Sequence, residues 1–390
     1  MELPLIAKQA ELKGLHLVGT GDSLHPKWLH HVKRNLFEES DGIYGMKNNS
    51  KTKFIIQTEV EDSKRVHHVI LFPSISSAES LYEVFKRFSH DIDRDGRAHL
   101  RINGDEIVDY AMDVNALVGP AHAFTPWTSL YKEYNSLSEC YGDNTKNIKF
   151  LELGLSADTY MADRIPELQD ITFMSNSDTH SPWPHRLGRE FNRIKVKELT
   201  FLEIEKAIEH KNNRGFTLNV GLNPKEGKYH ITACSKCYLK FKINDAIRLN
   251  FRCPECNGII KKGVMDRVNE LSKWKEPKNP WHRPKYIHII PLAEVISLAT
   301  GISTITSKRI KDKWNLLIDK FGTEINILVD TKIDKIKEED YKIGMIIEKF
   351  RMDKINYISG GGGLYGRPTL RSESDRYWGY GQSSLSDFLM

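Results

Sequence analysis

The chain has 390 residues, enough for two or three domains that each bury a core of their own. Hydrophobic residues make up 39% and charged residues 28%, and no run approaches the roughly 18 apolar residues that a membrane span needs, so a soluble globular protein is expected and an integral membrane protein is excluded. The net charge of +5 permits nucleic-acid binding without demonstrating it, and the N-terminus lacks a signal-peptide pattern. We therefore expect a cytoplasmic protein with no membrane partner.

Short β-like runs alternate with helical patterns from Gly14 to about Lys211. The strand-like runs are GLHLVGTG, KFIIQTEVE, RVHHVILFP, NALVGPAHAF, IKFLELGLS and ITFMSNSD. Between them lie segments such as SSAESLYEVFKRFSHDI and LTFLEIEKAIEHK, whose apolar residues recur at spacings of three and four. This alternation predicts an α/β fold with a parallel sheet or barrel.

The remainder of the chain divides into shorter units. Residues 230–260 form a compact cysteine-bearing module, and a linker rich in Lys, Pro and Trp follows at residues 273–286. Residues 287–356 have a mixed α/β pattern in which INILVD is expected to be a strand. The predicted domains are a catalytic domain (1–215), a cysteine module (216–275), a smaller C-terminal α/β domain that binds DNA (276–368) and a flexible tail (369–390).

Metal-ligand side chains occur near the ends of almost all the strand-like runs of the first domain. They are Asp22 and His25, Glu59, His67 or His68, His122, and Asp178 and His180. In parallel β/α folds the C-terminal ends of strands converge, so these residues are expected to meet in space. One such residue is more often a cap or a buried hydrogen-bonding group, but the succession favours a centre for Zn²⁺, Mn²⁺ or Fe²⁺ in which a carboxylate bridges two ions.

The motifs GTGD, TEVE, HHVILFP, GPAHAF and SNSDTHSPWPHRLGRE, in this order, resemble the polymerase and histidinol phosphatase (PHP) superfamily. The segment LELGLSADTYMADRIPEL, the cysteine module and a glycine-rich stretch narrow the resemblance to the endonuclease Q family, over nearly the whole chain. The resemblance implies a distorted PHP-type β/α barrel, with the cysteine module inserted into it or following it. Members of the superfamily open with a strand that carries an HxH ligand pair, and this sequence starts downstream of it. Either this start lies too far downstream and omits the pair, or the chain is an impaired member; loss of the two ligands is expected to weaken metal binding severely.

The resemblance also implies metal-dependent hydrolysis of a phosphodiester, with Asp22, Glu59 and Asp178 as catalytic residues. Two or three divalent ions (Zn²⁺, Mn²⁺ or Mg²⁺) would be bound. Glu59 would bridge ions, His68 and His122 would complete one, Asp178 another, and Asp22 or His25 with His180 a third. Because neighbouring residues of a strand point to opposite faces, only one of His67 and His68 faces the ions; His68 is preferred here, with His67 as support.

The expected substrate is DNA that contains deaminated bases such as uracil or hypoxanthine, cut on their 5′ side, as the family resemblance implies. Two alternatives remain open. One is a phosphoesterase of the same superfamily that acts on small phosphate esters. The other is a catalytically impaired protein that only binds DNA or a sliding clamp.

Two CxxC pairs, CSKC (234–237) and CPEC (253–256), are separated by fifteen residues, as in a zinc ribbon. Four thiolates complete tetrahedral Zn²⁺ and leave no open position, so the site is expected to be structural. Two matched pairs argue against a redox role. The predicted ligands are Cys234, Cys237, Cys253 and Cys256, and Cys140 is expected to be an inert thiol.

Several cationic or glycine residues are candidates for contacts to DNA. They are Arg186 and Arg189 near the predicted metal centre, Lys236 and Arg252 beside the cysteines, and Gly361 and Gly362 in SGGGGLYGRP; Arg97 and Arg101 are further candidates for holding phosphates. A solvated surface for the cations and a flexible linker for the glycines are the competing interpretations.

The C-terminal sequence QSSLSDFLM places Gln382, Leu385, Phe388 and Leu389 at the spacing Q-x-x-L-x-x-F-L. A short helical turn would bring the three apolar side chains onto one face, with Gln382 free to hydrogen-bond. The pattern resembles the motif by which DNA enzymes bind the sliding clamp PCNA. PCNA is therefore a predicted partner.

Overall fold

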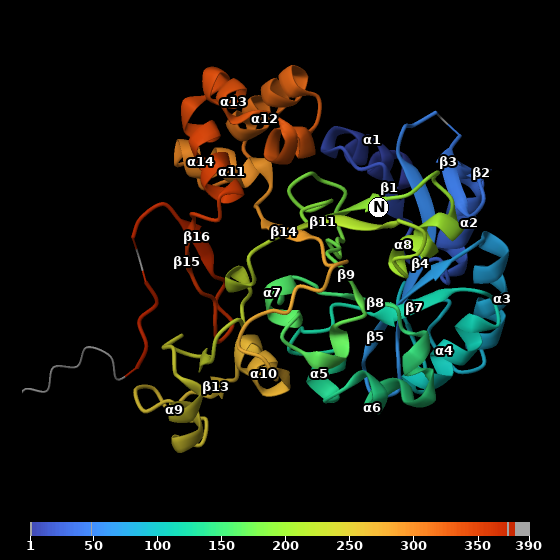
Figure 1. The fold of residues 1–390 in the computed structure, drawn as a ribbon, viewed down its shortest axis with the longest axis horizontal. Coiled ribbons are helices and arrows are strands. Elements are labelled where there is room, and N and C mark those ends of the chain that lie inside the picture. Colours follow the sequence, from blue (N-terminus) through green and yellow to red (C-terminus); the bar gives the residue numbers. More distant parts are fainter. Residues whose placement is uncertain (1, 48, 373, 379–390) are drawn as a thin grey trace, which may run out of the picture.

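The computed structural model describes residues 2–47, 49–372 and 374–378 (Figure 1). Up to residue 221 it alternates short strands and helices, as the sequence predicts. The elements are α1 (Leu3–Lys13), β1 (Leu17–Gly19), α2 (Pro26–Asn35), β2 (Leu36–Ser40), β3 (Ile43–Met46), β4 (Lys53–Glu61), β5 (His67–Phe72), α3 (Ile75–Phe85), β6 (Ala98–His99), α4 (Gly104–Met112), β7 (Leu117–Pro120), α5 (Leu130–Glu133), α6 (Leu137–Tyr141), η1 (Gly142–Asn147), β8 (Phe150–Glu152), α7 (Thr159–Ala162), η2 (Pro166–Leu168), β9 (Thr172–Met174), β10 (Phe191–Lys195), α8 (Phe201–Ile208) and β11 (Gly215–Gly221).

The central sheet is mixed, so the expectation of a parallel sheet is wrong for its middle strands. Its path runs β2-β3-β4-β5-β7, and β1 and β6 also pair with β4. Strands β1 and β6 are parallel to β4, whereas β3 and β5 are antiparallel to β4 and β7 is antiparallel to β5. The start of β5 therefore lies between the end of β4 and the end of β7.

Both faces of the sheet are covered at the middle strands β4 and β5, whose apolar residues divide between two buried clusters. Every residue of β5 is buried, and helix α3 packs against that strand. Ser74 caps the N-terminus of helix α3, because its side chain accepts a hydrogen bond from the backbone N–H of Ser77. The helix buries Ala78, Leu81 and Phe85, which are spaced three and four residues apart. Each fully buried Leu or Phe contributes about 1.5 to 3 kcal/mol. This packing holds the strand ends in fixed positions.

The cysteine module is an insertion between two paired strands. Strand β14 (Lys285–His288) returns to pair in parallel with β11, with Leu218 opposite Lys285. The intervening elements are η3 (Pro224–Glu226), β12 (Ala233–Cys234), α9 (Ile243–Arg248), β13 (Ile260–Lys261) and α10 (Val264–Leu271), drawn in yellow in Figure 1. The boundary predicted between residues 215 and 216 falls within β11, which belongs to the sheet of β10.

The C-terminal region is helical where a mixed α/β domain was predicted. After β14 come α11 (Leu292–Thr300), α12 (Lys308–Phe321), the π-helix η4 (Asn326–Asp330), α13 (Ile333–Glu339) and α14 (Tyr341–Arg351), and then the hairpin β15 (Asn356–Ile358) and β16 (Arg367–Thr369). The predicted strand INILVD is thus helical, and its Ile327 and Leu328 are buried in the helical core. A short apolar run suits a buried helix as well as a strand, so the pattern of residues 325–330 could not distinguish the two. Among the helices of the described residues, none is both long and apolar enough to cross a membrane.

A buried ion pair joins the first helix to the C-terminal helices. Lys13 Nζ lies 2.6 Å from Glu324 Oε1, and the two side chains are 1% and 0% exposed. Glu324 also accepts hydrogen bonds from Trp314 Nε1 (2.7 Å) and the backbone N–H of Leu292 (3.0 Å). The charge of each partner is compensated by these contacts, as burial of an ion pair requires.

Candidate metal centre

Three metal-ligand side chains meet where β4, β5 and β7 lie side by side. His67 Nδ1 lies 3.0 Å from Glu59 Oε1 and 3.0 Å from His122 Nε2, and His122 Nε2 lies 3.9 Å from Glu59 Oε2. One ligand atom from each of the three lies within 4.8 Å of the others. We call Glu59, His67 and His122 the Glu59 cluster.

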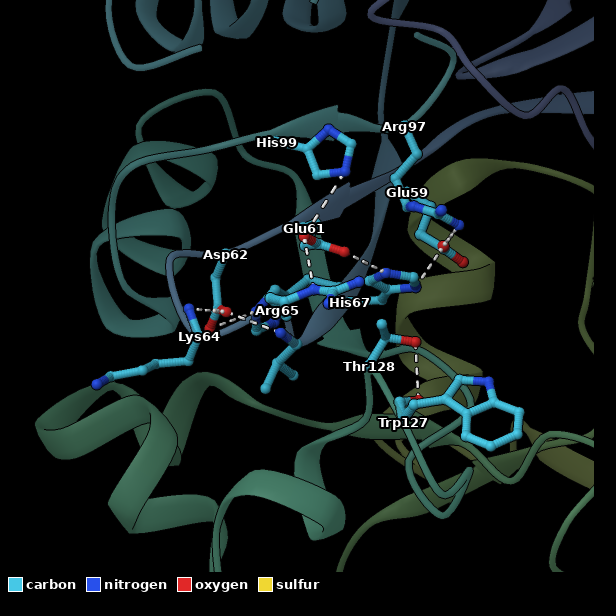
Figure 2. A network of polar contacts seen from close by, with 12 residues as sticks. Glu59, Glu61, Asp62, Lys64, Arg65, His67, Arg97, His99, Trp127 and Thr128 are labelled. Carbon is cyan, nitrogen blue, oxygen red and sulfur yellow. Dashed lines mark hydrogen bonds and ion pairs between the residues drawn. The ribbon is translucent and has the colours of Figure 1, made fainter. Parts of the chain in front are cut away.

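The pairing of β4 with β5 determines which side chains reach the Glu59 cluster. Glu61 is opposite His67 in the antiparallel register, so their side chains share a face of the sheet, and Glu59, two residues earlier, shares it too. Figure 2 shows Glu59, Glu61 and His67 gathered on this face. His122 follows β7 in a left-handed conformation (φ 30°), which turns the chain as it leaves the sheet.

The preference for His68 over His67 is not met by the geometry. His68 is fully buried on the opposite face, where Nδ1 lies 2.9 Å from Tyr141 Oη and Nε2 lies 3.3 Å from Asp62 Oδ2. Side chains alternate along a strand, so only His67 can face Glu59. His68 lies instead in a separate buried group with Asp62 and Cys140.

The Glu59 cluster favours the ionised form of its carboxylate. Burial alone would raise the pKa of Glu59, but hydrogen bonds from His122 and His67 outweigh it and hold that pKa well below the usual value. Burial likewise lowers the pKa of His122, and Glu59 more than offsets this, so the His122 pKa is raised. Imidazoles facing an ionised carboxylate are a donor set that suits Zn²⁺ or Mn²⁺.

The other predicted ligands surround this cluster without joining it in the described residues. Asp22 follows β1; burial raises its pKa, and the charges of His180, Glu59 and His25 also act on it. Asp178 follows β9, and its carboxylate contributes to the raised pKa of His122. His180 Nε2 lies 3.8 Å from Asp178 Oδ1 on an exposed loop.

Glu152, at the end of β8, is a residue of this region that the sequence analysis missed. Its Oε2 accepts a hydrogen bond from the backbone N–H of His122 (3.4 Å), and its Oε1 accepts one from Asn176 Nδ2 (2.7 Å). Burial raises the pKa of Glu152 to about 7. Its position at a strand end was the available signal, but the strand has only three residues.

A row of side chains continues from His67 away from the Glu59 cluster. Glu61 Oε2 lies 2.9 Å from His67 Nε2, and Glu61 Oε1 lies 3.6 Å from His99 Nε2 (Figure 2). His99 is in turn paired with Asp91. A carboxylate on the far nitrogen of a ligating histidine fixes both the ring and its tautomer. Glu61 thus leaves Nδ1 of His67 directed at Glu59.

Replacing Glu61 by alanine is expected to weaken binding of a divalent ion about 10- to 100-fold, because His67 would lose this constraint. Titration of the protein with Mn²⁺ or Zn²⁺ in a calorimeter measures the affinity. Glu61→Gln keeps an acceptor oxygen, so its loss should be smaller. Equal affinities for wild type and the alanine variant would contradict the assigned role.

The candidate phosphate-binding arginines differ in their surroundings. Arg97 Nη1 donates to Glu59 Oε1 at 3.1 Å, so this guanidinium lies directly beside the Glu59 cluster. Arg189 is turned inward and donates to the backbone oxygen of Ser177 (3.4 Å), and burial lowers its pKa. Arg186 is exposed. Of the three, Arg97 is thus the one whose side chain contacts the Glu59 cluster in the described part of the chain.

Glu190 immediately precedes β10 and has a buried carboxyl group. Its Oε1 accepts a hydrogen bond from the backbone N–H of Leu222 (2.9 Å), whereas its Oε2 has no hydrogen-bond partner among the described residues. Burial raises the pKa of Glu190 to about 8. The folded protein therefore keeps this proton at pH values where the unfolded chain, with a pKa of about 4.3, has lost it.

Because the folded state keeps the proton of Glu190 more tightly than the unfolded state, protonated Glu190 contributes fully to the free energy of unfolding below about pH 4. This contribution is lost as the pH rises to 8. Glu190→Gln, which cannot ionise, is expected to be more stable than wild type by about 2 to 5 kcal/mol at pH 8.5, with a much smaller difference at pH 5. Urea unfolding at the two pH values measures this. A difference independent of pH would exclude titration of Glu190 as its origin.

The four paired cysteines converge as the spacing predicts. Sγ of Cys234 lies 3.4 Å from that of Cys256, and Sγ of Cys237 lies 3.6 Å from that of Cys253. Four sulfurs at about 2.3 Å from one zinc ion would be about 3.8 Å apart. The arrangement is therefore suited to one tetrahedral metal ion. Lys236 and Arg252 are exposed beside it.

The glycine-rich stretch is packed against the cysteine module. A Cβ on Gly361 would lie 2.8 Å from the backbone oxygen of Ile231, and one on Gly362 would lie 2.2 Å from that of Cys234. These glycines are therefore required by close backbone packing. Contact of Gly361 and Gly362 with DNA stays a prediction. The predicted clamp-binding residues Gln382, Leu385, Phe388 and Leu389 lie outside the described residues.

The chain is similar to known proteins over most of its length. Residues 291–354 match the family model described as the MJ0043 C-terminal domain. The uncharacterized protein MJ0043 of Methanocaldococcus jannaschii is 48% identical over 262 residues, which are 66% of this chain and 32% of that protein, so the chain spans about a third of that relative. The uncharacterized protein YqxK of Bacillus subtilis is 31% identical over 381 residues, 93% of this chain and 91% of that protein.

Two solved structures also match closely. The lesion-specific endonuclease PfuEndoQ of Pyrococcus furiosus has a TM-score of 0.91 and 47% identity, covering 96% of this chain and 91% of that one. Endonuclease Q in complex with a 27-mer duplex substrate that has an abasic lesion at the active site has a TM-score of 0.88 and 47% identity, covering 95% of this chain and 92% of that one.

Proposed function

Because the chain belongs to the endonuclease Q family, we propose that it is a metal-dependent DNA repair endonuclease that hydrolyses the phosphodiester 5′ of a deaminated base such as uracil or hypoxanthine. The observation that carries this proposal is the Glu59 cluster, in which an ionised carboxylate and two imidazoles converge at strand ends. The donor set fits a divalent metal ion. A solved relative bound to lesion-containing duplex DNA supports the substrate class.

Divalent ions held by Glu59, His67 and His122 would supply a bound water of lowered pKa and neutralise charge on the phosphodiester. Glu59, whose oxygens lie 3.0 Å from His67 Nδ1 and 3.9 Å from His122 Nε2, would be a ligand shared by the ions. Asp22, Asp178 and His180 lie in the surrounding loops and complete the ligand set in this proposal. Arg97, which donates to Glu59 on one side and is partly exposed on the other, holds a phosphate oxygen of the substrate.

The cysteine module would hold a structural Zn²⁺, and its exposed Lys236 and Arg252 would contact the DNA backbone. Binding of the sliding clamp PCNA through the C-terminal sequence is part of the same proposal. An enzyme for small phosphate esters would need neither feature, which is why we favour DNA as the substrate.

The test is nicking of a duplex that carries one uracil or one hypoxanthine, with Mg²⁺, Mn²⁺ or Zn²⁺ as the added ion. We expect one product, cut on the 5′ side of the modified base, and no cutting of the matched undamaged duplex. Release of phosphate from small esters is measured in parallel. Ester hydrolysis without nicking would refute the proposed function.

A further inference from the structure

Three aromatic side chains from distant parts of the sequence, which we call the strip, are linked by contacts that start at Trp127, beside the Glu59 cluster. The rings of Trp127 and Tyr229 are in edge contact, with centroids 4.8 Å apart and planes at 79°. Lys228 Nζ lies over the ring of Tyr365, 4.6 Å from its centroid. Trp127 and Tyr365 are 53% and 67% exposed. Exposed aromatic side chains are common on protein surfaces, and these are distinguished by their contacts with each other and with a cation.

Trp127 is held by the same backbone that presents the metal ligands. Thr125 Oγ1 donates to the backbone oxygen of Trp127 (2.8 Å) and lies 3.1 Å from His122 Nδ1. The backbone N–H of His67 donates to the oxygen of Thr128 (3.2 Å), which has a left-handed conformation (φ 53°). Figure 2 shows Trp127 and Thr128 directly beneath His67. The exposed indole is thus fixed at a set position relative to the Glu59 cluster.

Tyr229 and Tyr365 are held by the glycine-rich loop. The backbone N–H of Gly363 donates to the oxygen of Lys228 (3.0 Å), and that of Gly366 donates to the oxygen of Glu226 (3.0 Å). A Cβ on Gly366 would lie 2.0 Å from the backbone oxygen of Lys225, so only glycine permits this approach. Tyr365 is therefore presented on a tightly docked loop, which limits the entropy lost when it binds.

We propose that Trp127, Tyr229 and Tyr365, with Lys228, form a stacking surface for unpaired bases next to the phosphodiester that is cut. The inference rests on the proposed function and adds the residues that receive bases outside the duplex stack. Aromatic faces accept any base, and a neighbouring cation attracts the phosphate backbone. The strip combines both features, and Trp127 places its first ring beside the Glu59 cluster, whereas a small phosphate ester would need no such surface.

The test compares DNA binding by alanine variants of the strip in a Glu59→Gln background, so that bound DNA is not cut. Fluorescence anisotropy at one fixed salt concentration measures the affinity for a duplex with one abasic site. Trp127→Ala and Tyr365→Ala are each expected to weaken binding about 5- to 100-fold, and Trp127→Phe much less. Trp281, which is 86% exposed and contacts His210 and His282, supplies the matched control, since Trp281→Ala should bind like the parent.

A spectroscopic readout separates stacking from a general loss of structure. A 2-aminopurine opposite the abasic site should be quenched on binding to the parent and less so with Trp127→Ala, while both proteins unfold at the same temperature. If the parent binds DNA and the alanine variants bind equally well, the inference is overturned and the proposed function stands. If the parent binds no DNA, both fail. Unchanged DNA binding with altered self-association would identify the strip as a protein contact and also overturn the inference.

Discussion

Nicking of a uracil-containing duplex is expected to fall about 10³-fold or more when Glu59 is replaced by glutamine. The amide preserves the volume of the side chain but not the charge that two imidazoles share, and an uncharged oxygen cannot neutralise divalent ions. Single-turnover nicking measures the rate, and mass spectrometry of the protein measures bound metal. Both should decrease together, because the carboxylate is assigned to the metal centre.

The matched control is Glu79→Gln. It removes a carboxylate of helix α3 that forms an exposed ion pair with Lys33 of helix α2. Exposed pairs of this kind contribute about 1 kcal/mol or less, so nicking by this variant should equal that of wild type. Wild-type nicking by Glu59→Gln would show that the Glu59 cluster is not where cleavage occurs.

The second large effect is expected for Cys253→Ser. The cysteine module has a small core, formed by Phe241, Ala246 and Ile260 around the cysteines, so a metal ion held by the four sulfurs would provide most of its stability. Structural zinc contributes about 10 to 16 kcal/mol in small modules, comparable to the whole stability of an ordinary domain. The variant should lose one zinc per chain, and the module should become sensitive to protease.

Limited proteolysis locates the effect, since cleavage should fall between β11 and β14 while the central sheet stays intact. Cys140→Ala is the control, because Cys140 is buried beside His68 and Tyr141, away from the paired cysteines, and should keep the zinc. Equal zinc content and equal protease resistance in Cys253→Ser and wild type would exclude a structural metal ion at the four cysteines.

Local spacing carried the correct predictions. The two CxxC pairs specify a tetrahedral group of sulfurs without knowledge of the rest of the fold. Glu59 and His122, which the structure brings together, were chosen as candidate ligands because each lies near the end of an apolar run. In a strand that is buried on both faces, a polar side chain is expected only near an end. Single-sequence patterns were sufficient wherever the chemistry is set within a few residues of the chain.

The pairing between strands could not be predicted from local spacing. The choice between His67 and His68 depends on the register in which β5 pairs with β4. A register error of one residue would place every side chain of β5 on the opposite face of the sheet. Glu152 was missed because its strand has three residues, and INILVD became helical because its surroundings are helices. Tertiary context determined each of these outcomes.

The Lys13–Glu324 pair limits how this protein can be dissected. Removing the C-terminal helices would take away Glu324 together with the surface that covers Lys13, whereas Glu324→Leu alone would leave a buried ammonium group without its counter-charge, at a cost of about 3 to 5 kcal/mol. Glu324→Leu should therefore be combined with Lys13→Met, whereas a shortened chain would return the Lys13 ammonium group to water and needs no such change.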